Sequence, residues 1–202
     1  MIAATVDGVA VPVGEVDARE AGLRDGPLAA ALPAAGTSEG RQLRRWLTQL
    51  IVTERVVAAQ AAALGVHGQD APSEADLLPD TTARLEIGSI AAAALSDPRA
   101  RALFARVTAV VDVSDDDVAD YHARNPLRFA ATAPDHHGWR APTAAAPPLH
   151  QVRALIANHL RAAARRRAFR VWLDECRAEL VELAPGYEHP GDPRQPDNTH
   201  RH

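Results

Sequence analysis

The sequence contains no lysine, a single cysteine and few aromatic residues. Its 22 basic residues are therefore all arginine, and 26 acidic residues outnumber them, so the formal net charge is −4. A chain with this balance has no general attraction to nucleic acids or anionic membranes, and we expect neither as a partner. The lone Cys176 excludes an intramolecular disulfide, so the fold should not depend on an oxidising compartment.

Long apolar runs are also missing. No window approaches the roughly 18 apolar residues of a membrane-spanning helix, and the first residues lack a basic segment followed by an apolar one. We therefore expect a cytoplasmic protein. Aromatic residues make up 4% of the chain and hydrophobic residues 47%, many of them alanine. Closely packed helices are the expected core, and 202 residues suit one domain with appendages.

The two ends of the chain predict a small sheet. β-Branched residues between Ala4 and Val11 flank Asp7-Gly8, a pair typical of a two-residue hairpin turn. Residues 179–183 partly alternate between polar and apolar, which indicates a short strand. We expect this strand to join the hairpin and close the fold.

Between these ends the apolar residues recur every three or four positions, which predicts a mainly α fold. The predicted helices cover residues 14–24, 37–64, 81–95, 97–108, 115–124 and 149–177, with loops at 26–36 and 68–79. Several prolines predict a linker at residues 130–148. We expect one helical domain over residues 1–184 and an extended polar tail over residues 185–202.

The segment Gly36-Thr37-Ser38-Glu39-Gly40 matches G-x-S-x-G, the nucleophile elbow. If the elbow forms, the chain is an acyltransferase similar to malonyl-CoA:acyl-carrier-protein transacylases, with Ser38 as the nucleophile and His67 or His122 as the base. However, a loop is predicted before the motif, and no alternation of strands and helices predicts a parallel sheet. A helix N-cap at Thr37 or Ser38 explains the same residues.

Histidines in the predicted tail suggest a second alternative. His189, His200 and His202 are interspersed with aspartates and can chelate zinc, nickel or copper, although no zinc-binding motif occurs and no other cofactor is expected. The varied, proline-punctuated tail also suits docking into a partner or back onto the protein's own surface. A metal-handling or partner-docking function through the tail therefore remains open.

Three segments combine into a family resemblance. Residues 6–17 lead from a hairpin into a helix, residues 113–129 join a Ser-Asp-Asp-Asp helix start to Asn-Pro-Leu-Arg-Phe, and residues 148–153 and 165–173 belong to one long helix. Together they resemble the SurA-type and PrsA-type parvulin chaperones over most of residues 1–184. The fold that this resemblance implies is a SurA-like helical chaperone lobe.

The sequence departs from this family in one respect, which excludes isomerase activity. Only the proline-rich linker lies between Phe129 and Pro147, where a parvulin domain of about 90–100 residues would be inserted. The implied function is non-catalytic binding of a protein or peptide client on an apolar groove. Trp46, Leu50 and Trp172 are the candidate groove residues, with burial in the core as the competing expectation.

Overall fold

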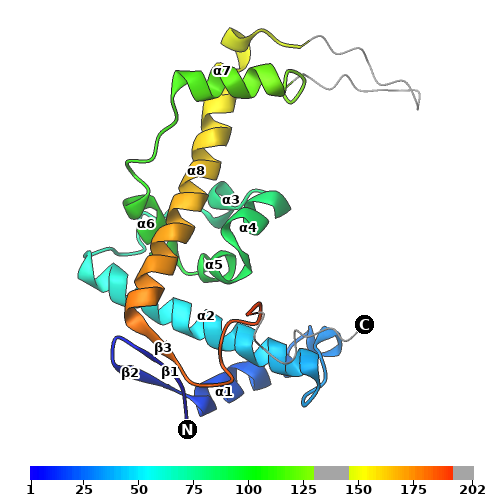
Figure 1. Ribbon diagram of the computed structural model, residues 1–202, viewed down its shortest axis with the longest axis vertical. Helices are drawn as coiled ribbons and strands as arrows, with labels where there is room; N and C mark the ends of the chain where they lie inside the picture. The colour runs from blue at the N-terminus through cyan, green and yellow to red at the C-terminus, as the bar shows by residue number, and fades with distance from the viewer. Residues whose placement is uncertain (130–145, 193–202) are drawn as a thin grey trace.

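A computed structural model describes residues 1–129 and 146–192 of the protein. This part is mainly helical with one small sheet (Figure 1). In chain order its elements are β1 (Ile2–Val6), β2 (Val9–Pro12), α1 (Val13–Arg24), the 3₁₀ turn η1 (Ala29–Ala31), α2 (Ser38–Ala63), α3 (Glu74–Leu77), α4 (Thr81–Ile87), α5 (Ser89–Ala94), α6 (Pro98–Val107), α7 (Asp115–Arg124), α8 (Leu149–Leu180) and β3 (Val181–Leu183).

The sheet has the strand order β2-β1-β3, with β1 antiparallel to both neighbours. Asp7 and Gly8 turn the hairpin with φ angles of 51° and 73°, the left-handed conformation that a two-residue turn of this kind requires. β3 pairs Val181 with Val6, and the Asp7 amide donates to the Leu180 carbonyl at 2.8 Å. The predicted hairpin and the predicted closing strand are both confirmed.

Helix α2 passes through the centre of the molecule and carries much of the core. Its residues Leu47, Ile51, Val52 and Val56 are at most 1% exposed. They belong to one apolar cluster that also receives side chains from the sheet, α5, α6 and the C-terminal part of α8. We call this part of the molecule the body.

A second, smaller cluster lies at the other end of α8. Val152 and Ile156 of α8 pack there against Val118 of α7. Figure 1 shows α7 across the far end of α8, beyond the body. We call α7 together with residues 149–160 the arm.

One predicted helix, at residues 81–95, is not continuous in the structure. Residues 81–95 form two helices, because Gly88 adopts φ 89° and ψ 149° between α4 and α5, a backbone conformation that residues with a Cβ avoid. The loop expected at 68–79 also contains the short α3, which begins with a capping box between Ser73 and Asp76. Helix α8 continues to Leu180, three residues beyond the predicted end.

Two further predictions concern the proline-rich linker and the absence of a membrane-spanning helix. Of the linker expected at residues 130–148, only residues 146–148 belong to the described part, and they lead into α8. Within residues 1–129 and 146–192, no helix combines the length and the apolar run that crossing a bilayer requires.

Candidate functional site

A cavity of about 470 Å³ lies where the body meets the arm. Its lining comes from the α3 region, from α6 and from one face of α8. We call it the junction cavity; its lining residues are Asp70, Pro72, Asp76, Leu77, Phe104, Ala105, Asn158, Arg161, Ala162, Arg165 and Arg166. The mixture of apolar side chains with several polar ones is typical of sites that bind organic ligands or peptide segments.

The helical period of α8 explains the polar part of this lining. Arg161, Ala162 and Arg165 lie three, four and seven residues after Asn158, so the four share one face of the helix. Arg161 is fixed in place by two neighbours: its Nε donates to Asp112 at 2.8 Å, and its Nη1 donates to Asn158 at 3.1 Å.

The next two arginines differ in how their N–H groups are used. Arg166 is 6% exposed, and its guanidinium donates to the Glu86 carboxylate at 2.8 Å and to the Leu77 carbonyl at 3.3 Å. The Nε atom of Arg165 is also buried, and none of the residues that the structure describes accepts a hydrogen bond from it. Arg165 itself lines the cavity, where the other N–H groups of its guanidinium can donate to a bound acceptor.

A second cavity, of about 440 Å³, lies between α2, the α4–α5 junction and the C-terminal half of α8. We call it the C-terminal cavity; it is lined by Thr53, Ile87, Gly88, Ser89, Ile90, Ala91, Arg170, Leu173, Asp174, Arg177 and His189. Because His189 belongs to the predicted tail, this cavity depends on where the tail lies.

The described part of the tail, as far as Asp192, lies against α2. Nε of Arg45 donates to the Gly186 carbonyl at 3.2 Å, and Nε2 of Gln49 donates to the Tyr187 carbonyl at 2.9 Å. Docking onto the protein's own surface, one of the alternatives that the sequence left open, is thus what residues 186–189 do. Burial, with a smaller contribution from the nearby Arg177, lowers the pKa of His189.

The three predicted groove residues do not line either cavity. Leu50 is 7% exposed and Trp172 packs on Phe169 with ring centroids 5.5 Å apart. Trp46 is partly buried against the core and donates its Nε1–H to Ser89 at 3.2 Å. All three are therefore placed as packing residues of the body.

The junction cavity was not predicted from the sequence. The available signal was the mixture of small alanines and long arginines in this part of the helix, because an alanine leaves space beside the long side chain of an arginine. The partners across the cavity, Phe104 and Leu77, come from distant segments and could not be assigned from local periodicity.

The tail histidines form no metal centre in the part that the structure describes. Nδ1 of His189 accepts the Gly191 amide at 3.0 Å, and no group of three or more metal-ligating side chains is found among residues 1–129 and 146–192. His200 and His202 lie outside the described residues.

Cys176 is buried, and its pKa is raised by burial and then by Glu179 and Glu175, which keeps the thiol protonated.

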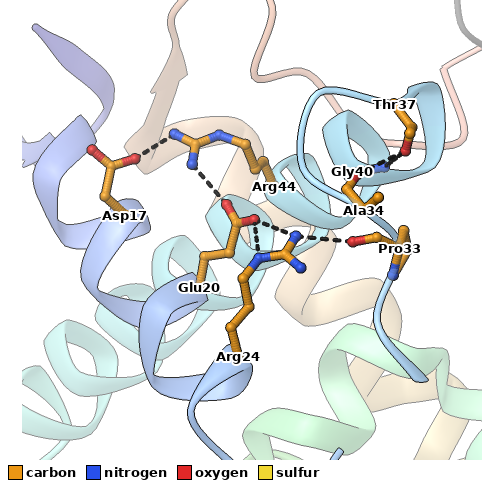
Figure 2. Close-up of polar contacts among 8 residues, drawn as sticks. All are labelled: Asp17, Glu20, Arg24, Pro33, Ala34, Thr37, Gly40 and Arg44. Carbon is orange, nitrogen blue, oxygen red and sulfur yellow. Dashed lines mark hydrogen bonds and ion pairs between the residues drawn. The ribbon is translucent and has the colours of Figure 1, made fainter. Parts of the chain in front are cut away.

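The G-x-S-x-G motif forms the start of α2 (Figure 2). Oγ1 of Thr37 accepts the Gly40 amide at 3.0 Å and donates to the Ala34 carbonyl at 2.8 Å, while Ser38 begins the helix. A Cβ on residue 40 would lie 2.4 Å from the Ala34 carbonyl oxygen, so this position needs glycine. A 3₁₀ turn and a loop precede the motif, so the strand-to-helix turn of an elbow is not formed at residues 29–40.

Next to this turn, an ion-pair cluster joins α1 to α2 (Figure 2). The Glu20 carboxylate accepts from Arg24 at 2.6 Å and from Arg44 at 2.7 Å, and Arg44 also pairs with Asp17 at 2.6 Å. Burial raises the pKa of Glu20, but the hydrogen bonds from both arginines outweigh it, so the pKa is lowered. Arg24 also donates to the Pro33 carbonyl at 2.9 Å, which ties the loop to the cluster.

Comparison with known proteins finds a similarity in this N-terminal region. A model described as a family of unknown function (DUF7158) matches residues 2–39, from β1 to the first residues of α2. No curated protein and no solved structure matches the chain. The function must therefore be argued from the geometry of the protein itself.

Proposed function

We propose that the protein is a non-catalytic, chaperone-like polypeptide-binding protein of the cytoplasm, similar to a SurA-type lobe without a parvulin domain. The order of its elements supports the likeness: a hairpin opens the fold, a long helix returns to the body, and a final strand closes the sheet. The observation that carries the proposal is the junction cavity.

The lining of the junction cavity suits an extended peptide. Leu77, Phe104 and Ala162 offer apolar surface to a side chain, and apolar burial is the main source of affinity for such segments. The guanidinium of Arg165 lines the cavity and can donate a hydrogen bond to a main-chain carbonyl, a group that every client possesses. Contacts of this kind give weak, exchangeable binding with little sequence preference.

The proposal is tested by fluorescence anisotropy with a labelled, permanently unfolded polypeptide such as reduced, carboxymethylated α-lactalbumin. Ala105 is exposed on α6 and lines the cavity, so Ala105→Trp should fill the space without disturbing the core. We expect micromolar binding by the natural protein and a loss of at least about tenfold in Ala105→Trp, because the indole occupies the client's position.

The matched control is Ala62→Trp, at an exposed position of α2 that lines neither cavity. Arg165→Met should weaken binding about fivefold, the loss expected for roughly one hydrogen bond of ~1 kcal/mol, whereas Arg167→Met at an exposed position of α8 should not. Equal binding by the Ala105→Trp and Ala62→Trp proteins would contradict the proposed site. No measurable binding by the natural protein would contradict the proposed function.

A further inference from the structure

The C-terminal cavity contains a guanidinium group that no carboxylate neutralises directly. Arg177 donates through Nη1 to the Gln49 carbonyl and the Thr53 hydroxyl, and through Nη2 to the Gln49 side-chain oxygen. All three partners are uncharged. No carboxylate of the described residues lies within ion-pair distance of Arg177, and burial lowers the pKa of its guanidinium.

This arrangement leaves two N–H groups of the guanidinium available for a ligand. The Nε–H of Arg177 and one Nη2–H have no partner among residues 1–129 and 146–192, although the residue lines the cavity. The charge of Asp174 acts on this half-buried cation from beyond ion-pair distance, and an anion bound directly beside the cation would offset more of the cost of burying it. A carboxylate matches the planar fork of a guanidinium.

The other charges around the cavity favour an anion as well. Arg170 also lines it, and the only carboxylate in the described lining is Asp174, whose oxygen lies 3.9 Å from Nε of Arg170. Two guanidinium groups thus face one carboxylate, which leaves a surplus of positive charge. His189 adds a polar imidazole at the same site.

The remaining lining is apolar and selects the rest of the ligand. Ile87, Ile90, Ala91 and Leu173 present aliphatic surface, and about 440 Å³ suits a small organic molecule better than a bare inorganic ion. Gln49 is fully buried, and its amide joins Arg177 to the Tyr187 carbonyl. The docked segment that carries His189 is thereby held over the same side chain that orients Arg177.

From these observations we propose that the C-terminal cavity binds a carboxylate attached to a small aliphatic body, with Arg177 and Arg170 as its cationic partners. Two sources share this chemistry: a free branched-chain carboxylic acid, and the C-terminal residue of a polypeptide that ends in an aliphatic side chain. The site is separate from the junction cavity, so it does not rest on the proposed chaperone-like function.

Isothermal titration of the full-length protein tests the proposal with 4-methylpentanoate, its neutral analogue 4-methylpentanamide and inorganic phosphate. We expect saturable binding of the acid and at least about tenfold weaker binding of the amide, which lacks the charge that strengthens the hydrogen bonds. Equal binding of acid and amide, binding of phosphate as tight as that of the acid, or no saturable binding of the acid overturns the proposal.

The same titration with a hexapeptide ending in leucine, as the free acid and as the C-terminal amide, distinguishes the two sources. Tighter binding of the peptide acid than of 4-methylpentanoate, with no binding of the peptide amide, identifies a polypeptide C-terminus as the ligand. Binding of 4-methylpentanoate alone identifies a free acid. Either result supports the carboxylate site.

Three substitutions of the same kind on α8 locate the binding. Arg177→Met should abolish binding of 4-methylpentanoate, and Arg170→Met, at an exposed position where folding is not at risk, should weaken it about threefold to tenfold. The control Arg167→Met lies at an exposed position outside both cavities and should bind like the natural protein. Unchanged affinity in both the Arg170→Met and Arg177→Met proteins would overturn the assignment, and Arg170→Met decides alone if Arg177→Met fails to fold.

Discussion

The body and the arm of this protein are built around the same helix, α8, yet they are stabilised very differently. In the body, Phe169 and Leu173 of α8 enter a cluster that includes α2, the sheet and several other helices. In the arm, the described part of the chain contributes three buried members to the small cluster, Val118, Val152 and Ile156. The comparison indicates that the arm can open locally while the body stays folded, since local stability follows the number of buried apolar groups.

The difference also bears on the proposed function. The junction cavity lies between the two regions, so its lining combines residues fixed by the body, such as Phe104, with residues at the base of the arm, such as Asn158. A site with one firm and one more mobile wall can accept clients of different shape. The C-terminal cavity, in contrast, is bounded by elements of the body alone and suits a smaller and more defined ligand.

The largest expected effect comes from weakening the body. Ile51 is 1% exposed in the centre of α2, and Ile51→Ala should lower the free energy of unfolding by about 2–5 kcal/mol, because it removes buried methyl groups and leaves a cavity. Urea denaturation followed by circular dichroism measures this loss. Leu64→Ala, at a position 46% exposed, should cost far less, and equal losses would refute the assignment of α2 as the central core helix.

The arm should respond locally rather than globally. Ile156 is fully buried in the small cluster, and Ile156→Ala should lower the free energy of arm opening by about 2–4 kcal/mol. Hydrogen exchange should then show lost protection in α7 and residues 149–160, with little change in α2. Leu155→Ala, 56% exposed on the same helix, is the control; loss of protection throughout the body would show that the two regions unfold together.

The ion-pair cluster between α1 and α2 should make stability depend on pH. Because the pKa of Glu20 is lowered in the folded state below its ordinary value, its contribution is present above that ordinary value and is lost as the pH falls through the folded pKa. Glu20→Gln should cost about 1.5–3 kcal/mol at pH 7, the range for hydrogen bonds to a charged group, and much less at pH 3.

Thermal denaturation between pH 3 and pH 7 measures this dependence. Glu54→Gln removes the carboxylate of a more exposed pair with Arg19 and should change stability only slightly at either pH. A Glu20→Gln penalty that does not shrink in acid would contradict the role assigned to the cluster.

The smallest expected effect concerns the break between α4 and α5. Gly88→Ala should destabilise the protein by about 1–2 kcal/mol, because φ 89° brings a Cβ close to the carbonyl oxygen of the backbone. Gly22→Ala is the control: it lies inside α1 with open space around it and should stabilise the protein by roughly 0.5–1 kcal/mol. Chemical denaturation of both variants should therefore give shifts of opposite sign, and shifts of the same sign would contradict the strain at residue 88.

Local sequence signals were sufficient for much of the fold. Asp7-Gly8 specified the hairpin turn, and Ser114 followed by three acidic residues predicted α7 with the bounds that are found, because turns and helix caps depend on neighbouring residues alone. The break at Gly88 was missed, since a glycine within an apolar repeat is compatible with a continuous helix until packing demands a change of direction.

The candidate sites depended on contacts between distant segments. The sequence alone determined that the chain is mainly helical, closes with a small sheet, and carries seven of its 22 arginines within residues 149–180. Only the tertiary structure decided that Arg165 and Phe104 line one cavity, and that Gln49 joins Arg177 to the docked Tyr187. The reason is physical: a helical pattern fixes which residues share a face, whereas their partners are set by how whole elements pack.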